Sequence, residues 1–365
     1  MIAKRLGRPD YFILFCVGLL VVFGLVMLAS ASSHLGETKF GNSYFYLKHQ
    51  ILYGLSLGIL GFLAAYAIPY SFYRKIALPL IIVSALTLFL VFTPLGFRAG
   101  GAERWVSLGP ITFQPAEFLK LAFIIYLAAW LSGDKERVES FSRGYLPFLL
   151  VAGAISILLI KQPSTSVVAI LMASALIVYF VSGAKLKYIF GTIVLGVAAL
   201  AVLIYVTPYR FQRVVNFLHP QADQLGAGYH LNQALIAIGS GGLTGVGYGQ
   251  STTKINFLPE PIGDSIFAVI AEETGFIGAS VLILLFMALV IRTFMLARKT
   301  TDKFGKLLLV GFGSLIALQA AMNIGAISGL LPLTGTPLPF ISYGGTALAV
   351  FMTMGGIIVN ISRYS

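Results

Sequence analysis

The chain has 365 residues, of which 58% are hydrophobic and only 10% are charged, and its formal net charge is +12. About a quarter of the residues of a soluble domain are charged, so this composition excludes an ordinary soluble protein and predicts burial of apolar surface in lipid. A single cysteine, Cys16, excludes a disulfide framework. The basic residues form no stripe interleaved with aromatic residues, which argues against nucleic-acid binding.

The first apolar run follows Lys4, Arg5 and Arg8, a pattern shared with cleaved signal peptides. The Ala-Ser-Ala sequence of residues 29–31 also resembles a signal-peptidase site. However, the run of residues 11–28 is longer than the roughly 7–15 apolar residues of a signal-peptide core. We therefore expect it to be the first spanning helix, with a cleaved signal peptide as the alternative.

At about 20 apolar residues for each crossing, the sequence predicts an all-α integral membrane protein. The ten predicted spans are 11–31, 47–68, 76–93, 115–132, 145–160, 165–182, 187–206, 265–291, 306–327 and 344–361. Ten spans place both termini on one side. Sixteen of the 25 lysines and arginines fall on that side, which the positive-inside rule assigns to the cytoplasm. The positive charge is thus predicted to face anionic inner-leaflet lipids.

One long polar segment, residues 207–264, separates the seventh and eighth predicted spans. No linker or soluble region is large enough to fold alone, so residues 1–365 are predicted to form one membrane domain. Within it, residues 207–265 are expected to form a large extracytoplasmic loop that carries the active site. This loop ends at the carboxylate of Asp264, just before the apolar run that begins at Ile266.

Three acidic residues fall inside predicted spans, where a charge at the bilayer centre costs roughly 2.5–3.5 kcal/mol. Lys120 lies one helical turn after Glu117, so we expect an ion pair. This pair either locks the helix packing or lines a polar cavity open to the outer leaflet. Glu272 and Glu273 lie more than two turns beyond Asp264 and are expected to be structural or to line a cavity.

The four histidines, at positions 34, 49, 219 and 230, lack metal-binding spacing, so no zinc site is predicted. His230 is singled out because it lies in the long polar segment. Residues 239–249 are rich in glycine but match neither a P-loop nor a dinucleotide fingerprint. They predict a tightly packed loop with positive-φ positions, or alternatively backbone N–H groups that approach a lipid pyrophosphate. The chain has no G-x-S-x-G motif, which disfavours Ser/His/Asp chemistry.

Three groups of residues together resemble one protein family. They are residues 104–109 with 114–120, then residues 228–273, and finally residues 329–332, 338–345 and 360–363. With these groups, the whole chain resembles the SEDS family (shape, elongation, division and sporulation), to which RodA and FtsW belong. Residues 28–33 and 339–345 lean toward FtsW.

The resemblance implies a peptidoglycan glycosyltransferase that polymerises lipid II at the outer face of the bacterial cytoplasmic membrane. It also implies a class B penicillin-binding protein as the partner, whose transpeptidase crosslinks the new glycan. The family's essential loop carboxylate corresponds to Asp264, and its membrane ion pair corresponds to Glu117 and Lys120.

The chain departs from the family pattern at two places. No acid follows Gln162 and Pro163, where family members often carry an aspartate. The usual Thr-Asp-Phe sequence is replaced by Gly263, Asp264 and Ser265. The catalytic aspartate is retained, but its immediate neighbours differ.

The leaving group of lipid II is a pyrophosphate, which needs no protonation, so one base suffices where a glycosidase uses two carboxylates. We expect Asp264 to accept the proton of the acceptor GlcNAc 4-hydroxyl as that oxygen attacks C1 of the donor MurNAc with inversion. Such base catalysis contributes about 10²–10⁴-fold. Candidate cations for the pyrophosphate are Arg104, Arg210, Arg213 and Lys254. Further candidate substrate-binding residues are Glu117, Lys120, Gln233, Glu260 and Ser342.

A divalent cation, Mg²⁺ or Mn²⁺, is an alternative means of neutralising the pyrophosphate. The loop carboxylates near it are Asp264, Glu260 and Asp223. No dedicated metal site is predicted from the sequence.

Two other functions remain open from the residues alone. A lipid II flippase would use Glu117 and Lys120 in a cavity across the membrane, with Asp264 as a gate. A non-catalytic scaffold would recruit the division or elongation machinery without using Asp264.

Overall fold

The computed structural model describes residues 7–99, 102–108, 111–133, 138–218 and 228–364. Most of these residues are helical, because a backbone in lipid has no water to bond and satisfies its polar groups within each helix. The first half contains α1 (Tyr11–Phe40), α2 (Phe45–His49), η1 (Gln50–Leu55), α3 (Ser56–Ala67), α4 (Ser71–Phe89), η2 (Leu90–Phe92), α5 (Pro115–Leu131), η3 (Phe141–Tyr145), α7 (Leu146–Lys161) and α8 (Thr165–Val181). The second half contains α9 (Leu186–Val206), α10 (Pro208–Leu218), α11 (Tyr229–Ser240), α12 (Thr253–Asn256), α13 (Ile266–Lys299), α14 (Lys303–Ile327) and α15 (Gly345–Ser362).

Eight helical stretches in the described part of the chain are long and apolar enough to cross a membrane. Helices also occupy the remaining two predicted spans, 115–132 and 165–182, but α5 and α8 have only 17 residues each. That length is near the lower limit for crossing a bilayer core. The predicted interruption between the fifth and sixth spans occurs between α7, which ends at Lys161, and α8, which begins at Thr165.

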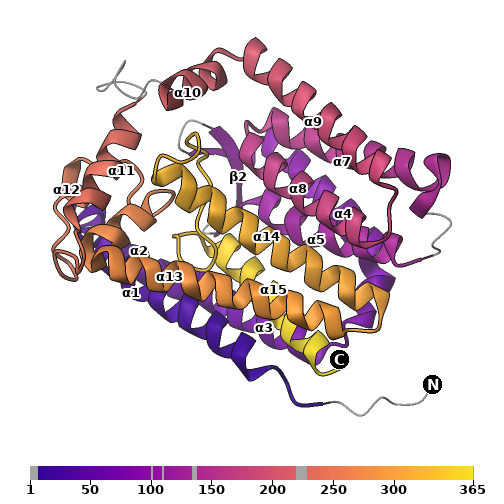
Figure 1. Ribbon diagram of the computed structural model, residues 1–365. Coiled ribbons are helices and arrows are strands. Elements are labelled where there is room, and N and C mark those ends of the chain that lie inside the picture. The colour runs from indigo at the N-terminus through magenta and orange to yellow at the C-terminus, as the bar shows by residue number, and fades with distance from the viewer. Residues whose placement is uncertain (1–6, 100–101, 109–110, 134–137, 219–227, 365) are drawn as a thin grey trace.

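The centre of the bundle is formed by α5, α8, α14 and α15, around which the other long helices pack (Figure 1). α15 packs along α3, while α14 packs against α8 and α13. Small residues allow this close approach, as in other membrane bundles. At Gly356 of α15, an added Cβ would lie only 2.5 Å from the carbonyl oxygen of Phe62 in α3.

A small antiparallel sheet interrupts the otherwise helical fold and corrects the all-α expectation. It contains β1 (Gly96–Ala99), β2 (Ala102–Leu108) and β3 (Ile111–Phe113), in that order. Phe97 lies opposite Trp105, and Val106 lies opposite Phe113. These strands were not predicted because they are short and lie between two long apolar runs.

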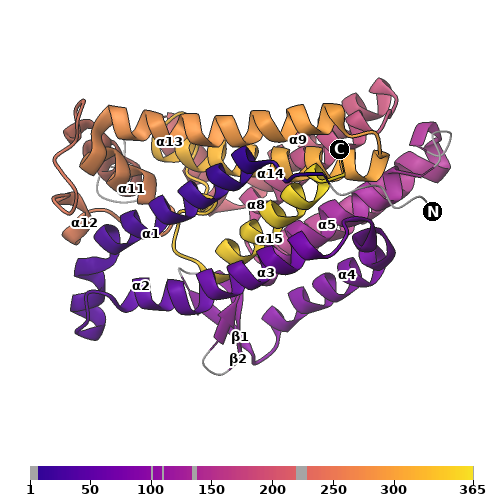
Figure 2. The ribbon, with the colours of Figure 1, turned by 90° about the horizontal axis from the view of Figure 1, so that it is seen from below.

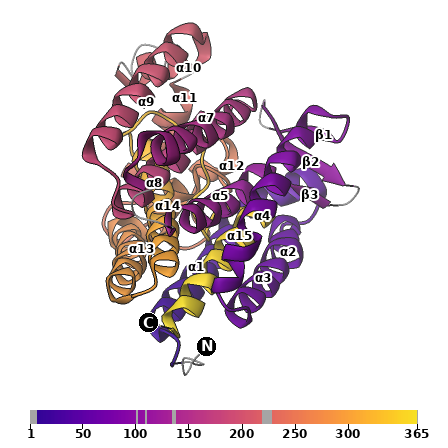
Figure 3. The same ribbon diagram turned by 90° about the vertical axis from the view of Figure 1, so that its right-hand side faces the viewer.

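The two ends of the described chain meet at one end of the bundle (Figures 2 and 3). The backbone N–H of Gly7 donates to the carbonyl oxygen of Arg363 over 2.8 Å. The backbone N–H of Asp10 donates to the hydroxyl of Ser362 over 2.9 Å. The polar helices α11 and α12 lie at the opposite end, beyond α1 and α13 (Figure 1).

Candidate active site

The described part of the long polar segment contains helices α10, α11 and α12, rather than one extended loop. α11 packs against the first part of α13. Residues 219–227, which include His219 and Asp223, lie outside the described residues. The described part of the segment therefore presents folded structure at one end of the bundle, and Asp264 is its last residue.

The glycine-rich residues 241–247 fill a break in α13. Gly275 has φ 68° and ψ −169°, which interrupts the helix and frees carbonyl oxygens on its preceding turn. Val246 N–H donates to the carbonyl of Glu272 over 3.0 Å, and Gly247 N–H donates to that of Glu273 over 3.1 Å. In return, the carbonyl of Gly242 accepts from Phe276 N–H over 2.9 Å. These N–H groups are occupied by protein, which supports the tightly packed loop over a phosphate-binding loop.

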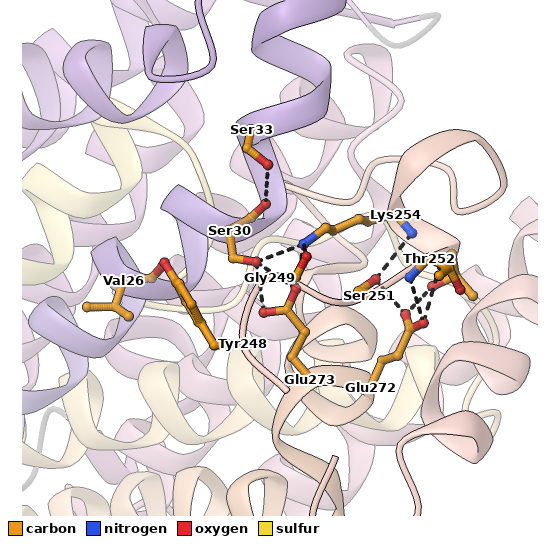
Figure 4. Close-up of polar contacts among 11 residues, drawn as sticks. Val26, Ser30, Ser33, Tyr248, Gly249, Ser251, Thr252, Lys254, Glu272 and Glu273 are labelled. Atoms are coloured by element: carbon orange, nitrogen blue, oxygen red, sulfur yellow. Dashed lines mark hydrogen bonds and ion pairs between the residues drawn. The ribbon is translucent and has the colours of Figure 1, made fainter. Parts of the chain in front are cut away.

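The side chains of Glu272 and Glu273 link α13 to the start of α12 and to α1 (Figure 4). Glu272 accepts hydrogen bonds from the hydroxyls of Ser251 and Thr253, and from the backbone N–H of Thr252 over 3.1 Å. Glu273 accepts from the hydroxyl of Ser30 in α1 over 2.6 Å. Both carboxylates are therefore structural, one of the two roles expected from their depth.

Lys254, which the sequence predicted to bind the pyrophosphate, belongs instead to the same buried cluster as Glu272 and Glu273. Its ammonium lies 2.6 Å from Glu273 Oε1 and donates to Ser30 and to the carbonyl of Gly249 (Figure 4). An ammonium has three donors, and these contacts use all of them. The structure thus separates Lys254 from the predicted set of pyrophosphate-binding cations.

Asp264, which lies just before the start of α13, lines a cavity of about 400 Å³. The cavity lies between α10, α11, α14 and the segment that follows α14. Its lining residues are Tyr209, Gln212, Arg213, His230, Glu260, Asp264, Asn323, Ala326, Ile327 and residues 333–336. Charged and polar groups therefore converge on the predicted base, in a partly open cavity of the size that ligand sites have.

The backbone beside Asp264 is held by residues far along the chain. The side-chain amide of Asn323 donates to the carbonyl of Asp264 over 2.8 Å, and also to that of Thr336 over 2.7 Å. The hydroxyl of Ser342 donates to the carbonyl of Gly263 over 2.7 Å. Ser342 is buried and positions the main chain that carries Asp264, rather than lining the cavity.

Gly335 gives the carboxylate of Asp264 room. It has φ +64°, and an added Cβ would lie 3.3 Å from Asp264 Oδ2. A side chain at position 335 would therefore be strained in its backbone and would press on the carboxylate.

Burial, and after it the neighbouring charge of Glu260, raises the pKa of Asp264, which lies at about 6 when all its neighbours are included. The guanidinium groups of Arg104 and Arg213 act in the opposite direction but only in part. At neutral pH the carboxylate is mostly ionised and more basic than an ordinary aspartate. A base with a pKa just below the working pH is well suited to proton abstraction.

His230 is a cavity residue that the sequence flagged without giving it a role. Its Nε2 lies 2.6 Å from the hydroxyl of Ser265, which itself donates to the carbonyl of Pro259 over 2.7 Å. Burial and the nearby charge of Arg213 lower the pKa of His230. The imidazole is therefore neutral at pH 7.

A second cavity of about 220 Å³ adjoins the first and contains Arg104, Arg210 and Arg213. The two cavities share Tyr209, Arg213 and residues 333–336. Arg210 and Arg213 lie over the ring of Tyr209, at 5.2 and 5.6 Å from its centroid. Three of the four predicted cations are thus brought together beside Asp264.

Arg104 of the second cavity is held by neutral backbone groups. The guanidinium of Arg104 donates to the backbone carbonyls of Gln162 and Pro163, over 3.2 and 2.5 Å. These neutral oxygens hold the side chain without cancelling its charge. Arg210 adds a buried Nε that has no hydrogen-bond partner among the described residues. The second cavity is therefore suited to an anionic group.

The predicted ion pair between Glu117 and Lys120 forms in α5, over 2.8 Å. Lys120 also donates to Gln319 over 2.7 Å, and Gln319 donates to the carbonyl of Pro337 over 2.9 Å. Both charged residues are 1% exposed, and neither lines the two cavities. Through Gln319, the pair is linked to the carbonyl of Pro337, which follows the cavity residue Thr336.

Some predicted residues and some cavity residues do not coincide. Gln233 lies one turn after His230 on α11 and lines neither cavity. Tyr209, Asn323, Gly335 and Thr336 line the Asp264 cavity but were not predicted. Asn323 carried a signal, because an amide inside an apolar span needs hydrogen-bond partners.

A family model described as "Cell cycle protein", for the FtsW/RodA/SpoVE group, matches residues 10–365. The chain is 36% identical over 358 residues to stage V sporulation protein E of Bacillus subtilis strain 168, covering 98% of each chain. It is 37% identical over 359 residues to the "Probable peptidoglycan glycosyltransferase FtsW" of Trichlorobacter lovleyi, covering 98% of this chain and 94% of the relative.

Two solved structures share the whole fold. One is from work described as "Structural coordination of polymerization and crosslinking by a peptidoglycan synthase complex", with a TM-score of 0.79 and 27% identity over 100% of this chain and 98% of the other. The second is the rod shape determining protein RodA of Thermus thermophilus, with a TM-score of 0.72 and 28% identity over 98% of each chain.

Proposed function

The chain belongs to the FtsW/RodA/SpoVE family of cell cycle proteins, and from this we propose that it is a peptidoglycan glycosyltransferase that polymerises lipid II. The observation that carries the proposal is the junction of two cavities. One holds a carboxylate whose pKa is raised to about 6, and the other holds three arginines. A base beside a cationic pocket is what transfer of a sugar from a pyrophosphate requires.

The proposed orientation places both termini in the cytoplasm, with ten helices crossing the bacterial cytoplasmic membrane. Residues 207–265 then form a catalytic segment at the outer face, within a single membrane domain. The meeting of Gly7 with Arg363 at the end opposite α11 and α12 supports this orientation. The bias of lysine and arginine toward the terminal side supports it as well.

In the proposed reaction, the carboxylate of Asp264 takes the proton from the GlcNAc 4-hydroxyl of the acceptor. The hydroxyl oxygen forms a bond to C1 of the donor MurNAc from the face opposite the pyrophosphate. The C1–oxygen bond to undecaprenyl pyrophosphate breaks, and the configuration at C1 inverts. One proton moves to Asp264 and one anion leaves, so the step needs no second acid.

The arginines of the second cavity are proposed to hold the pyrophosphate. Arg213 borders both cavities and is placed to bridge the leaving group and the base. Guanidinium groups bind phosphate oxygens with two parallel hydrogen bonds. The same cavity is lined by Leu200 and Ile204 of α9, which offer apolar contacts to the isoprenoid.

A Mg²⁺ or Mn²⁺ ion fits this site only as an ion bound largely by the substrate. The described residues contain no cluster of three or more His, Cys, Asp or Glu able to hold a metal. Asp264 and Glu260 are the two carboxylates of the cavity that would contact it. Such an ion would neutralise pyrophosphate charge, as Mg²⁺ does when it is shared between carboxylates and phosphates.

The two alternatives fit the geometry less well. A flippase that used Glu117 and Lys120 requires an open path around them, yet both side chains are buried to 1% exposure. A non-catalytic scaffold leaves the raised pKa of Asp264 without a use. A class B penicillin-binding protein is the proposed partner, and the similarity to a chain of a peptidoglycan synthase complex supports that pairing.

The decisive experiment is polymerisation of purified lipid II by the full chain with its partner, comparing wild type with Asp264→Asn. Asparagine keeps the size of the side chain but removes the base, so glycan strands should fall by about 10²–10⁴-fold. Glu139→Gln is a matched control, because Glu139 lies at the surface beside Lys185. Each variant is assayed with and without Mg²⁺ and Mn²⁺. Retained polymerisation by Asp264→Asn would reject the assignment.

A further inference from the structure

A third cavity, of about 440 Å³, lies at the end of the bundle where the chain termini meet. It is formed by the start of α1, the end of α13 and the end of α15, far along the chain from Asp264. Its lining residues are Arg8, Pro9, Asp10, Tyr11, Phe12, Arg292, Met295, Leu296, Lys299 and Ser362. No step of the proposed reaction uses it.

The wall of this cavity is fixed by contacts of Asp10. The carboxylate caps α1 by accepting from the backbone N–H groups of Phe12 and Ile13, over 3.1 and 3.2 Å. Its other oxygen accepts from Nε of Arg292 over 2.8 Å. The backbone N–H of Asp10 is bonded to Ser362. These contacts hold the first described residues against α13 and α15, so the shape of the cavity is fixed by hydrogen bonds and an ion pair.

The cavity has a surplus of positive charge. Arg8, Arg292 and Lys299 line it, and Asp10 is the one carboxylate among its lining residues. That carboxylate is already shared between Arg292 and the N-terminus of α1. Arg8 and Lys299 form no ion pair within the described part of the chain. Two exposed cations therefore face the same space without a counter-charge.

Apolar side chains extend from this basic cavity along two helices. Tyr11 and Phe12 are 63% and 48% exposed on α1, and Phe15 continues the strip one turn further at 62%. On α13, Met295 is 44% exposed, and Ile291 continues one turn further at 52%. An inorganic anion would use only the cations, whereas an amphiphile would use the cations and both apolar strips.

We propose that this cavity binds one anionic phospholipid, with its phosphate between Arg8, Arg292 and Lys299. The acyl chains lie along the strips of α1 and α13 that begin at Phe12 and Met295. In the orientation proposed above the cavity faces the inner leaflet, whose anionic lipids attract basic residues at the membrane surface. The bound lipid joins α1, α13 and α15 at the end of the bundle remote from the active site.

The test is titration of the full chain in detergent with dioleoylphosphatidylglycerol, followed by native mass spectrometry that counts bound lipids. The Arg8→Gln/Lys299→Gln variant removes both unpaired cations while keeping the Asp10–Arg292 pair. We expect the dissociation constant of the tightest lipid to rise roughly 30-fold, at about fivefold for each basic residue lost. Dioleoylphosphatidylcholine, which carries no net charge, should bind weakly to wild type and be unaffected by the variant.

The matched control is Lys75→Gln/Arg298→Gln, which removes one lysine and one arginine from exposed positions outside the cavity. It should leave phosphatidylglycerol binding unchanged, and the melting temperature of each variant in detergent reports whether it is folded. Equal losses in the control and the test variant, or no loss in a folded test variant, would overturn the proposal. Displacement of the lipid by an equal concentration of inorganic phosphate would also overturn it, by identifying a simple anion site.

Discussion

The imidazole Nε2 of His230 lies 2.6 Å from the hydroxyl oxygen of Ser265, the residue that follows Asp264. Because Ser265 donates its own proton to the carbonyl of Pro259, the hydroxyl accepts from His230, and Nε2 carries the imidazole proton. Nδ1 is then the acceptor atom of a neutral histidine in the Asp264 cavity. The hydroxyl of Ser265 makes this arrangement possible.

A hydrogen bond from the acceptor substrate to Nδ1 predicts that His230→Ala slows polymerisation about 3–10-fold, the worth of one hydrogen bond. His230→Gln should retain most of the rate, because its amide can both donate to Ser265 and accept from substrate. Initial rates across lipid II concentrations measure the effect. An alanine variant as active as wild type would show that the imidazole only fills space.

The rate should fall as the pH drops below about 6, because Asp264 becomes protonated there and loses its function as a base. Glu260→Gln removes a negative charge that raises the pKa of Asp264, so the midpoint of the pH profile should move to lower pH. Arg213→Gln removes a positive charge that lowers this pKa, so the midpoint should move to higher pH.

The direction of the midpoint is the readout in these profiles, since either variant also changes the maximal rate. His230→Gln removes the titratable imidazole and so separates its contribution to the pH profile from that of Asp264. If Asp264 is the group whose protonation lowers the rate, the His230→Gln variant should still lose activity as the pH falls below about 6. Shifts of the same sign for Glu260→Gln and Arg213→Gln would contradict the electrostatic account.

Lys254→Met should destabilise the protein by about 3–5 kcal/mol, because it leaves the carboxylate of Glu273 buried without its counter-charge. The double variant Lys254→Met/Glu273→Gln should recover much of that loss. Denaturant unfolding in detergent measures both. Lys185→Met is the matched control: it breaks an exposed pair with Glu139 at 3.9 Å and should cost less than about 1 kcal/mol. A double variant no better than the single one would argue against a paired role.

Gly245→Ala should lower the melting temperature clearly, at a cost of about 1–3 kcal/mol. Gly245 has φ +84°, and an added Cβ would collide with the carbonyl oxygen of Glu273. Gly239→Ala is the contrasting control within the same glycine-rich run, because it lies in α11 with open space around the new methyl group. It should leave stability unchanged or raise it slightly. Similar melting temperatures for the two variants would contradict the packing of the loop into α13.

The helical part of the fold was largely predictable, because an apolar run of this length has one stable form in lipid. Every predicted span contains a helix, and Asp264 was singled out as the candidate base from its place before Ile266 and from the family resemblance. The strands and α12 were missed because they are short, and α10 and α11 were missed because they lie within a segment whose overall polarity favoured a loop. Lys254 could not be assigned from sequence. Its partners Ser30 and Glu273 lie far along the chain, and only tertiary packing brings them together.

The anchoring of Asp264 from the C-terminal side has a consequence for biosynthesis. Ser342 and Asn323 hold the backbone at residues 263 and 264, yet both are translated long after them. A nascent chain that has inserted only as far as α13 carries the proposed base but not the groups that fix it. Ordering of the proposed catalytic centre must therefore wait until Ser342 has been translated, so a chain terminated before that residue is left without an ordered Asp264.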